Sequence, residues 1–111
     1  MIGIDVVRID RIRTLLARSP RFAERFFTPE ERDYCRASND PALHLAGTLA
    51  GKEAVMKALR LTPAPAWMRR VEIVREPQGA PVGRAVGREI ALSISHEADV
   101  AVAVAIDLTR A

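Results

Sequence analysis

The chain has 111 residues, of which 49% are hydrophobic and 28% are charged, and its formal net charge is +3. This length suits one domain, residues 1–111, with a modest core that self-association would enlarge. No apolar run approaches the ~20 residues that cross a bilayer, and no secretory signal opens the chain. We therefore expect a cytoplasmic protein with no membrane partner. The lone Cys35 excludes an internal disulfide and is interpreted as a structural thiol.

The opening residues predict a strand followed by a short helix. Large aliphatic residues alternate along the first segment: Ile2, Ile4 and Val6. This alternation predicts a strand that buries these side chains and turns Asp5 to its other face. Asp10 is expected to cap a helix that runs to about Ala17.

The first quarter of the chain is strongly basic. It contains six arginines: Arg8, Arg11, Arg13, Arg18, Arg21 and Arg25. Such a segment indicates an anionic partner. Nucleic acid is one candidate, although the segment lacks the aromatic interleaving expected of a single-strand binder. An acidic protein surface is the other.

Two further helices are expected in the middle of the chain. In residues 28–31, Thr-Pro-Glu-Glu, a hydroxyl N-cap, a proline at the first helical position and a glutamate three residues after the cap predict a helix start. A break at residues 39–41 then precedes a longer helix from about Ala42 to Leu59.

The longer helix has distinct faces when its residues are placed ~100° apart. Lys52 falls in an apolar stripe, and Glu53 and Lys57 fall in the neighbouring stripe. The back of the helix is formed by small residues, so another element could approach it closely: Gly47, Gly51, Ala54 and Ala58.

Three strands are expected in the second half of the chain. VEIVREP (71–77) alternates like a strand and ends at a turn over residues 78–79. The other two lie around Ile90 to Ser95 and Val100 to Leu108. Residues 80–89 fit no element.

Asp5 and Glu53 are candidate ligands of a metal ion. Mg²⁺ binds one or two carboxylates, and water and substrate phosphates complete its coordination. Two structural alternatives stay open. Asp5 could be an exposed strand residue, and Glu53 could form an ordinary i,i+4 pair with Lys57 worth ~0.2–0.5 kcal/mol.

Lys52 and His96 also allow two interpretations. An ammonium in an apolar stripe must find a partner, lose its charge or snorkel to the surface. Alternatively, Lys52 and Lys57 flank an ion bound by Glu53 and neutralise charge on a leaving phosphate. His96 closes a predicted strand near Ser93 and Ser95, and is either structural or a phosphate ligand.

Five segments together resemble the holo-acyl-carrier-protein synthase family of 4′-phosphopantetheinyl transferases. In chain order they are GIDVVRIDRI, RFAERFFTPEE, HLAGTLAGKEAVMKAL, VEI, and LSISH followed by VAVAVAIDL. The resemblance implies an α+β fold, with a small antiparallel sheet packed with a long central helix, and a homotrimer with active sites between subunits. It also implies Mg²⁺-dependent transfer of 4′-phosphopantetheine from coenzyme A to a serine of an apo acyl carrier protein, with release of adenosine 3′,5′-bisphosphate.

The resemblance also implies roles for individual residues. Asp5 and Glu53 match the family's metal ligands, and Glu53, or water on the metal, is the candidate for taking the serine proton. Lys57 matches a lysine near the pyrophosphate and joins Asp5 and Glu53 in the expected catalytic set. Lys52 and His96 match positions beside the metal site and the nucleotide phosphates, as ligands of coenzyme A. The positions that dock the acidic carrier protein correspond to Arg11, Arg18 and Arg21.

The chain departs from the family pattern at Thr48. The family usually reads AGRFAAKEA where this chain has AGTLAGKEA, so Thr48 replaces an arginine expected to help bind coenzyme A. Arg60, Arg69 and Arg70 are candidates for compensation. This loss keeps open a weak or inactive module that only binds carrier proteins. A basic nucleic-acid binder, which would show steeply salt-dependent binding, has the least support, so we expect no nucleic-acid partner.

Overall fold

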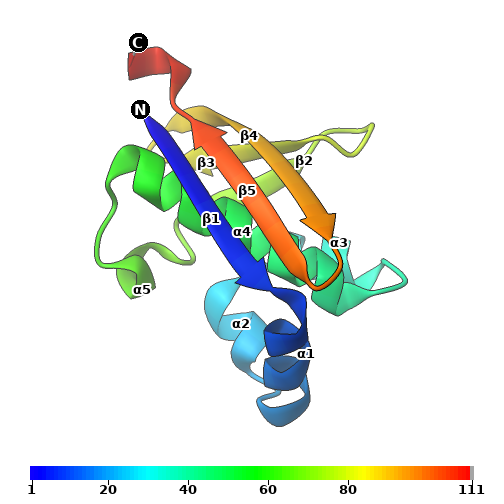
Figure 1. Ribbon diagram of the computed structural model, residues 1–111. Coiled ribbons are helices and arrows are strands. Elements are labelled where there is room, and N and C mark those ends of the chain that lie inside the picture. The colour runs from blue at the N-terminus through cyan, green and yellow to red at the C-terminus, as the bar shows by residue number, and fades with distance from the viewer. Residues whose placement is uncertain (111) are drawn as a thin grey trace.

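A five-stranded antiparallel sheet lies against one long helix in the computed structural model (Figure 1). The helix is α4 (Pro41–Leu59), and the sheet has the order β1-β5-β4-β3-β2. The strands are β1 (Ile2–Arg8), β2 (Glu72–Arg75), β3 (Pro81–Ala85), β4 (Arg88–Glu97) and β5 (Val100–Ile106). The structure describes residues 1–110, and Ala111 of the predicted domain lies outside the described residues. The predicted α+β arrangement of a small antiparallel sheet and a long helix is confirmed.

Shorter helices cover the ends of this two-layer core. They are α1 (Ile9–Arg18), α2 (Phe22–Phe26), α3 (Pro29–Arg36), α5 (Ala64–Trp67) and the 3-10 helix η1 (Leu108–Arg110). The capping box at the start of α3 is present, because the Thr28 hydroxyl accepts from the Glu31 amide at 3.2 Å and the Glu31 carboxylate accepts from the Thr28 amide at 2.8 Å. Among the described helices, none has both the length and the hydropathy of a membrane span.

The prediction that Asp10 caps α1 is wrong. The helix begins two residues earlier than this cap implies, at Ile9, and Arg8 occupies the N-cap position. Asp10 therefore lies within the first turn, where a carboxylate still favours the positive end of the helix dipole. Its side chain pairs with Arg8 on the surface, at 2.8 Å.

The small residues of α4 form a back that another element approaches closely, as predicted, and that element is the sheet. The backbone of Gly47 and Gly51 lies against Ile94, and that of Gly51 also against Leu92, both on β4. Gly3 of β1 approaches α4 so closely that a Cβ there would collide with the backbone oxygen of Ala54. This close approach places the neighbouring Asp5 against α4.

The predicted burial of β1 is inverted. Gly3, Asp5 and Val7 face α4, whereas the large aliphatic residues lie on the opposite face of the sheet, with exposed fractions of 68%, 56% and 58% for Ile2, Ile4 and Val6. Alternation identifies two faces of a strand but does not say which one the core covers. The tight contact of small residues with α4 decides that question here.

Strand β3 lies in the stretch that sequence reasoning left unassigned. It pairs with both β2 and β4, and joins β4 through a turn in which Val86 (φ 47°) and Gly87 (φ 74°) have positive φ. Such a turn is usually signalled by Asn-Gly or Asp-Gly. Because valine occupies the first position here, the sequence does not indicate the turn.

Candidate functional site

Asp5, Glu53 and Lys57 form one cluster where β1 meets α4. The Lys57 ammonium donates to the backbone oxygen of Ile4 at 2.9 Å and to Oδ1 of Asp5 at 3.1 Å. Asp5 is mostly buried, whereas the side chain of Lys57 is largely exposed. The Lys57 side chain therefore extends along the surface and places its ammonium on the mostly buried Asp5 carboxylate.

Glu53 has an unusually weak acid group. Burial and, after it, the adjacent Asp5 carboxylate together raise the pKa of Glu53 to about 7, against the opposing positive charges of Lys57 and Arg11. Two carboxylates held this close repel each other unless a proton or a cation lies between them. The pair is thus poised to bind either one near neutral pH.

The cluster fits a hard divalent cation. Oδ2 of Asp5 is one of two buried side-chain polar atoms, among the described residues, that lack a hydrogen-bond partner. A cation would satisfy this oxygen and relieve the repulsion from Glu53. The described residues contain no group of three or more histidine, cysteine or acidic ligands. Two carboxylates suit Mg²⁺, which keeps water and substrate oxygens in its remaining positions.

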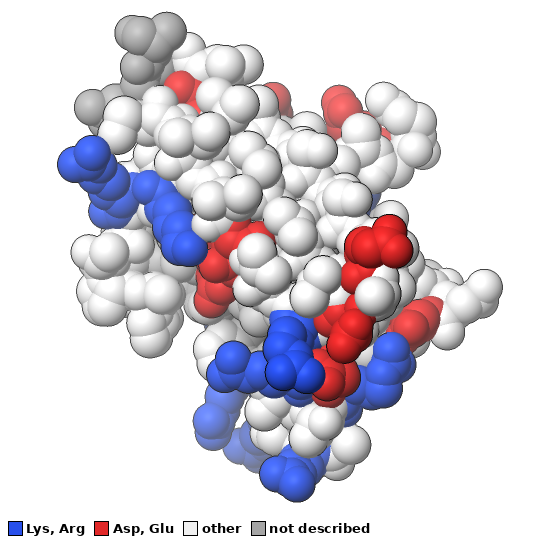
Figure 2. Space-filling model, viewed as in Figure 1, with Lys and Arg blue, Asp and Glu red and all other residues white. Residues whose placement is uncertain are grey.

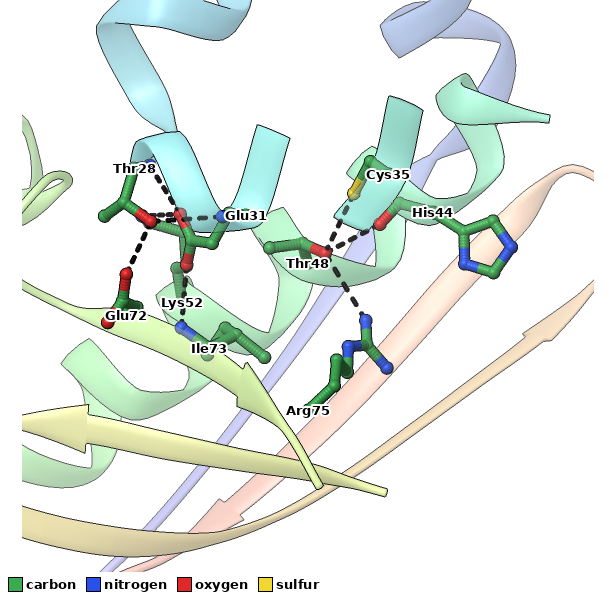
Figure 3. Close-up of polar contacts among 9 residues, drawn as sticks. All are labelled: Thr28, Glu31, Cys35, His44, Thr48, Lys52, Glu72, Ile73 and Arg75. Atoms are coloured by element: carbon green, nitrogen blue, oxygen red, sulfur yellow. Dashed lines mark hydrogen bonds and ion pairs between the residues drawn. The ribbon is translucent and has the colours of Figure 1, made fainter. Parts of the chain in front are cut away.

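Lys52 lies in the interior, away from this cluster. Its side chain is completely buried and its ammonium contacts Oε1 of Glu31 at 2.7 Å (Figure 3). Burial lowers the pKa of Lys52 and raises that of Glu31, and each charge counteracts the effect on the other. The expectation of a Lys52 contact with coenzyme A does not fit this placement, because a fully buried ammonium on a carboxylate cannot reach a phosphate.

The Lys52–Glu31 pair belongs to a network that joins three elements. Besides the ammonium and the Thr28 amide, Glu31 accepts the backbone amide of Ile73 in β2 at 2.7 Å. The Thr28 hydroxyl donates to Glu72 at 2.7 Å. Lys52 and Glu31 therefore fix α3, α4 and β2 relative to one another.

His96 lies in a second polar cluster, apart from Asp5 and Glu53. Through β5, the residue of β4 opposite Asp5 is Ile94, and His96 is two residues further along. With strands ~4.8 Å apart and ~3.4 Å per residue, the Cα atoms of Asp5 and His96 are roughly 12 Å apart. The positive charges of Arg75 and His96 both lower the pKa of His44, after the larger effect of burial. His96, His44 and Arg75 are therefore neighbours.

The predicted docking arginines lie on the exposed surface of the helical end. Arg11 and Arg18 are seven residues apart on α1 and so share one face, and Arg21 directly precedes α2. Figure 2 shows basic side chains gathered at this lower end of the molecule. Beside them runs a groove of about 400 Å³. Arg11 and Glu53 line it together with apolar side chains, among them Leu15, Phe22, Phe26, Leu49 and Met68.

Comparison with known proteins assigns the family. The model of the 4′-phosphopantetheinyl transferase superfamily matches residues 1–105. A holo-[acyl-carrier-protein] synthase of Caldanaerobacter subterraneus is 36% identical over 116 residues, which cover 95% of this chain and 91% of that protein. This chain belongs to the holo-acyl-carrier-protein synthase family.

Other members of the holo-acyl-carrier-protein synthase family agree in sequence and in structure. The enzyme of Beutenbergia cavernae is 41% identical over 118 residues, 95% of this chain and 94% of its own. The Helicobacter pylori synthase in complex with coenzyme A superposes with a TM-score of 0.83 at 32% identity, covering 96% of this chain and 98% of that one. The Bacillus anthracis synthase, in complex with CoA (3',5'-ADP), has a TM-score of 0.81 at 30% identity, covering 94% and 91%.

Two residues of this synthase-family chain escaped sequence reasoning. Glu31 was interpreted only as part of a capping box, although the need of Lys52 for a partner was the signal that a buried acid existed. No sequence motif singles out Arg75. It lies two residues from the buried Ile73 in β2, so both side chains are on the inner face of the sheet. The arginine that contacts Thr48 is Arg75, and not one of the candidates for compensation, Arg60, Arg69 and Arg70.

Proposed function

We propose that this chain transfers 4′-phosphopantetheine from coenzyme A to a serine of an apo acyl carrier protein, with Mg²⁺, and releases adenosine 3′,5′-bisphosphate. The observation that carries the proposal is the paired Asp5 and Glu53 carboxylates, with one buried oxygen unpartnered. Lys57 lies beside them at 3.1 Å from Asp5. Similarity to synthases, one of which is in complex with coenzyme A, supports this reaction.

Each residue of the cluster has a role in this reaction. Asp5 and Glu53 would hold Mg²⁺, which supplies Lewis-acid chemistry at a pyrophosphate. The serine oxygen attacks the phosphorus that bears pantetheine, and the bond from that phosphorus to the bridging oxygen breaks. The electron pair leaves on adenosine 3′,5′-bisphosphate. Lys57 stabilises the developing negative charge, and the Glu53 carboxylate, or water on the metal, would take the serine proton.

The carrier protein would dock on α1 and α2. Arg11, Arg18 and Arg21 supply positive charge for an acidic helix, and Arg11 and Glu53 both line the apolar groove. A carrier bound there would present its serine to the carboxylate cluster. Charged residues at the rim of such a surface mainly speed association.

We further propose that the active unit is a homotrimer. The open face of the sheet carries the exposed Ile2, Ile4 and Val6 of β1 beside the outward residues of β5, Val102, Val104 and Ile106. Over β5 and β4 this face is mostly uncharged (Figure 2). Contiguous apolar surface of this kind marks an interface. Other copies of this chain are the occupants that the family resemblance implies.

Sedimentation velocity tests the trimer. We expect three times the chain mass of 12.2 kDa for the unmodified protein. Ile4→Glu buries a charge in the proposed interface and should give monomers without transfer activity. Val86→Glu puts the same charge on an exposed apolar residue in the β3–β4 turn and should leave the trimer intact. A monomeric unmodified protein that transfers phosphopantetheine would contradict the trimer.

Mass spectrometry tests the reaction itself. Apo acyl carrier proteins are incubated with this chain, coenzyme A and Mg²⁺, and the expected result is a gain of ~340 Da on the carrier, the mass of the covalent group. Carrier binding without any gain would instead favour the inactive binding module. Folded protein that modifies none of several carriers would contradict the proposed function.

A further inference from the structure

Arg75 at the end of β2 is held by neutral groups. Its guanidinium lies over the ring of Tyr34, with Cζ 4.7 Å from the ring centroid, and Nη2 donates to the Thr48 hydroxyl at 3.4 Å (Figure 3). Among the described side chains, no ion pair joins Arg75 to a carboxylate. Its nearby acid Glu72 accepts a hydrogen bond from Thr28. The guanidinium is oriented by its contacts but keeps its charge uncompensated.

His44, beside Arg75, lies in a region of positive potential. The imidazole of His44 packs edge-on against Tyr34, with ring centroids 5.9 Å apart. Burial and the positive charges of Arg75 and His96 lower the pKa of His44, and the charge of Asp40 opposes them. Groups from α4, β2 and β4 thus converge on a place that favours an anion.

Thr48 explains why an arginine is needed from β2. It is buried in α4, and its hydroxyl donates to the His44 carbonyl at 2.8 Å. A threonine there cannot extend a charge to the surface as an arginine would. The guanidinium of Arg75 contacts Thr48 instead. A guanidinium is therefore still present at this position of the fold, but it comes from β2 and not from α4.

We propose that Arg75 binds the 3′-phosphate of coenzyme A, in place of the family arginine that Thr48 replaces. The inference rests on the proposed function, because it takes coenzyme A as the substrate. A guanidinium presents several donors in a fixed plane that matches a phosphate. The side chains of His44 and His96 are available as further donors at the same place.

The position of Arg75 selects the 3′-phosphate over the pyrophosphate. β1, which carries Asp5, and β2, which carries Arg75, are opposite edges of the sheet. Four strand spacings of ~4.8 Å separate them by roughly 19 Å. The proposed function places the pyrophosphate at the carboxylate cluster, so the phosphate of coenzyme A that remains for Arg75 is the 3′-phosphate.

Calorimetric binding of coenzyme A and of 3′-dephospho-coenzyme A tests this assignment without requiring turnover. The two molecules differ only in the 3′-phosphate. Arg75→Met should weaken the binding of coenzyme A about tenfold or more, as expected for a lost charge-assisted bond, and should leave the dephospho compound within about twofold. Arg36→Met, the matched control at an exposed arginine of α3, should change neither. Arg75→Lys keeps the charge without the planar guanidinium. Its affinity for coenzyme A should lie between those of the unmodified protein and Arg75→Met.

The possible outcomes separate this inference from the proposed function. Equal weakening of both ligands by Arg75→Met, or weakening of neither, overturns the assignment of Arg75. Unmodified protein that binds neither ligand overturns both proposals. Protein that binds coenzyme A in an Arg75-dependent way but transfers nothing overturns the transfer reaction and retains the phosphate site. Introducing Thr48→Arg into a folded Arg75→Met protein should restore selective binding of coenzyme A.

Discussion

Replacing Glu53 by glutamine should stabilise the metal-free protein above neutral pH. The folded-state pKa of Glu53 is about 7, against an ordinary value of 4.5. Below the ordinary value both states hold the proton, so the carboxylate costs nothing. Between pH 4.5 and about 7 the unfolded chain loses this proton while the folded state keeps it, so the free energy of unfolding falls as the pH rises. Above pH 7 both states are ionised and the loss of stability is complete.

The size of this effect follows from the pKa difference. At ~1.36 kcal/mol per pH unit, the shift corresponds to at most about 3 kcal/mol. Glu53 is half-buried, so solvent screening reduces the effect, and we expect about 1–2 kcal/mol at pH 8. This corresponds to roughly 5–10 °C in Tm for a domain of this size. Glu53→Gln removes the charge and keeps the shape of the side chain.

Thermal unfolding with a chelator at pH 8 and pH 5, at one protein concentration, measures the effect. Glu53→Gln should raise Tm at pH 8, and the gain should shrink at pH 5. Mg²⁺ should then raise Tm for the unmodified protein, through binding to the folded state, and should not do so for the variant. Glu76→Gln, at an exposed glutamate, should leave Tm unchanged. A lower Tm for Glu53→Gln at pH 8 would refute the idea of two repelling carboxylates.

Three further predictions concern packing and docking. Gly3→Ala should destabilise the protein by about 2 kcal/mol or more, since its methyl group meets the α4 backbone; an unchanged denaturant midpoint would contradict this contact. Lys52→Met should lower the free energy of unfolding by about 3–5 kcal/mol because it leaves the Glu31 charge buried without its ammonium partner. Adding Glu31→Gln should recover part of this loss. A Lys52→Met variant as stable as the unmodified protein would argue against a charged pair. Arg18→Glu should raise the KM for the carrier protein with kcat nearly unchanged, and steady-state kinetics showing no change in KM would place the docking surface elsewhere.

Helix α4 and its small-residue back were predictable from sequence because the pattern is long and local. The helix starts at a proline and has a stripe of glycine and alanine residues. Its extent, and the face that another element can approach closely, therefore follow from spacing. The orientation of β1 was not predictable. Ile4 and Asp5 are equally consistent with either face until the position of α4 is known.

The partners of the site residues were also out of reach, since they are distant in sequence. Glu31 lies 21 residues from Lys52, and Arg75 lies 27 residues from Thr48. Neither pair belongs to a local pattern such as an i,i+4 contact. Residue chemistry alone made Asp5 and Glu53 candidate metal ligands with structural alternatives open, and the resemblance to a family favoured the metal site. The structure adds the unpartnered Asp5 oxygen.

The central claim is that Asp5 and Glu53 hold the divalent cation needed for transfer. The most direct measurement is transfer to an apo carrier protein by the unmodified chain and by Asp5→Asn, across a Mg²⁺ titration, with the ~340 Da gain as readout. We predict transfer by the unmodified protein that disappears on chelation and returns with Mg²⁺. We predict no transfer by folded Asp5→Asn at any Mg²⁺ concentration. Near-normal turnover by that variant, or transfer that persists in the chelator, would contradict the claim.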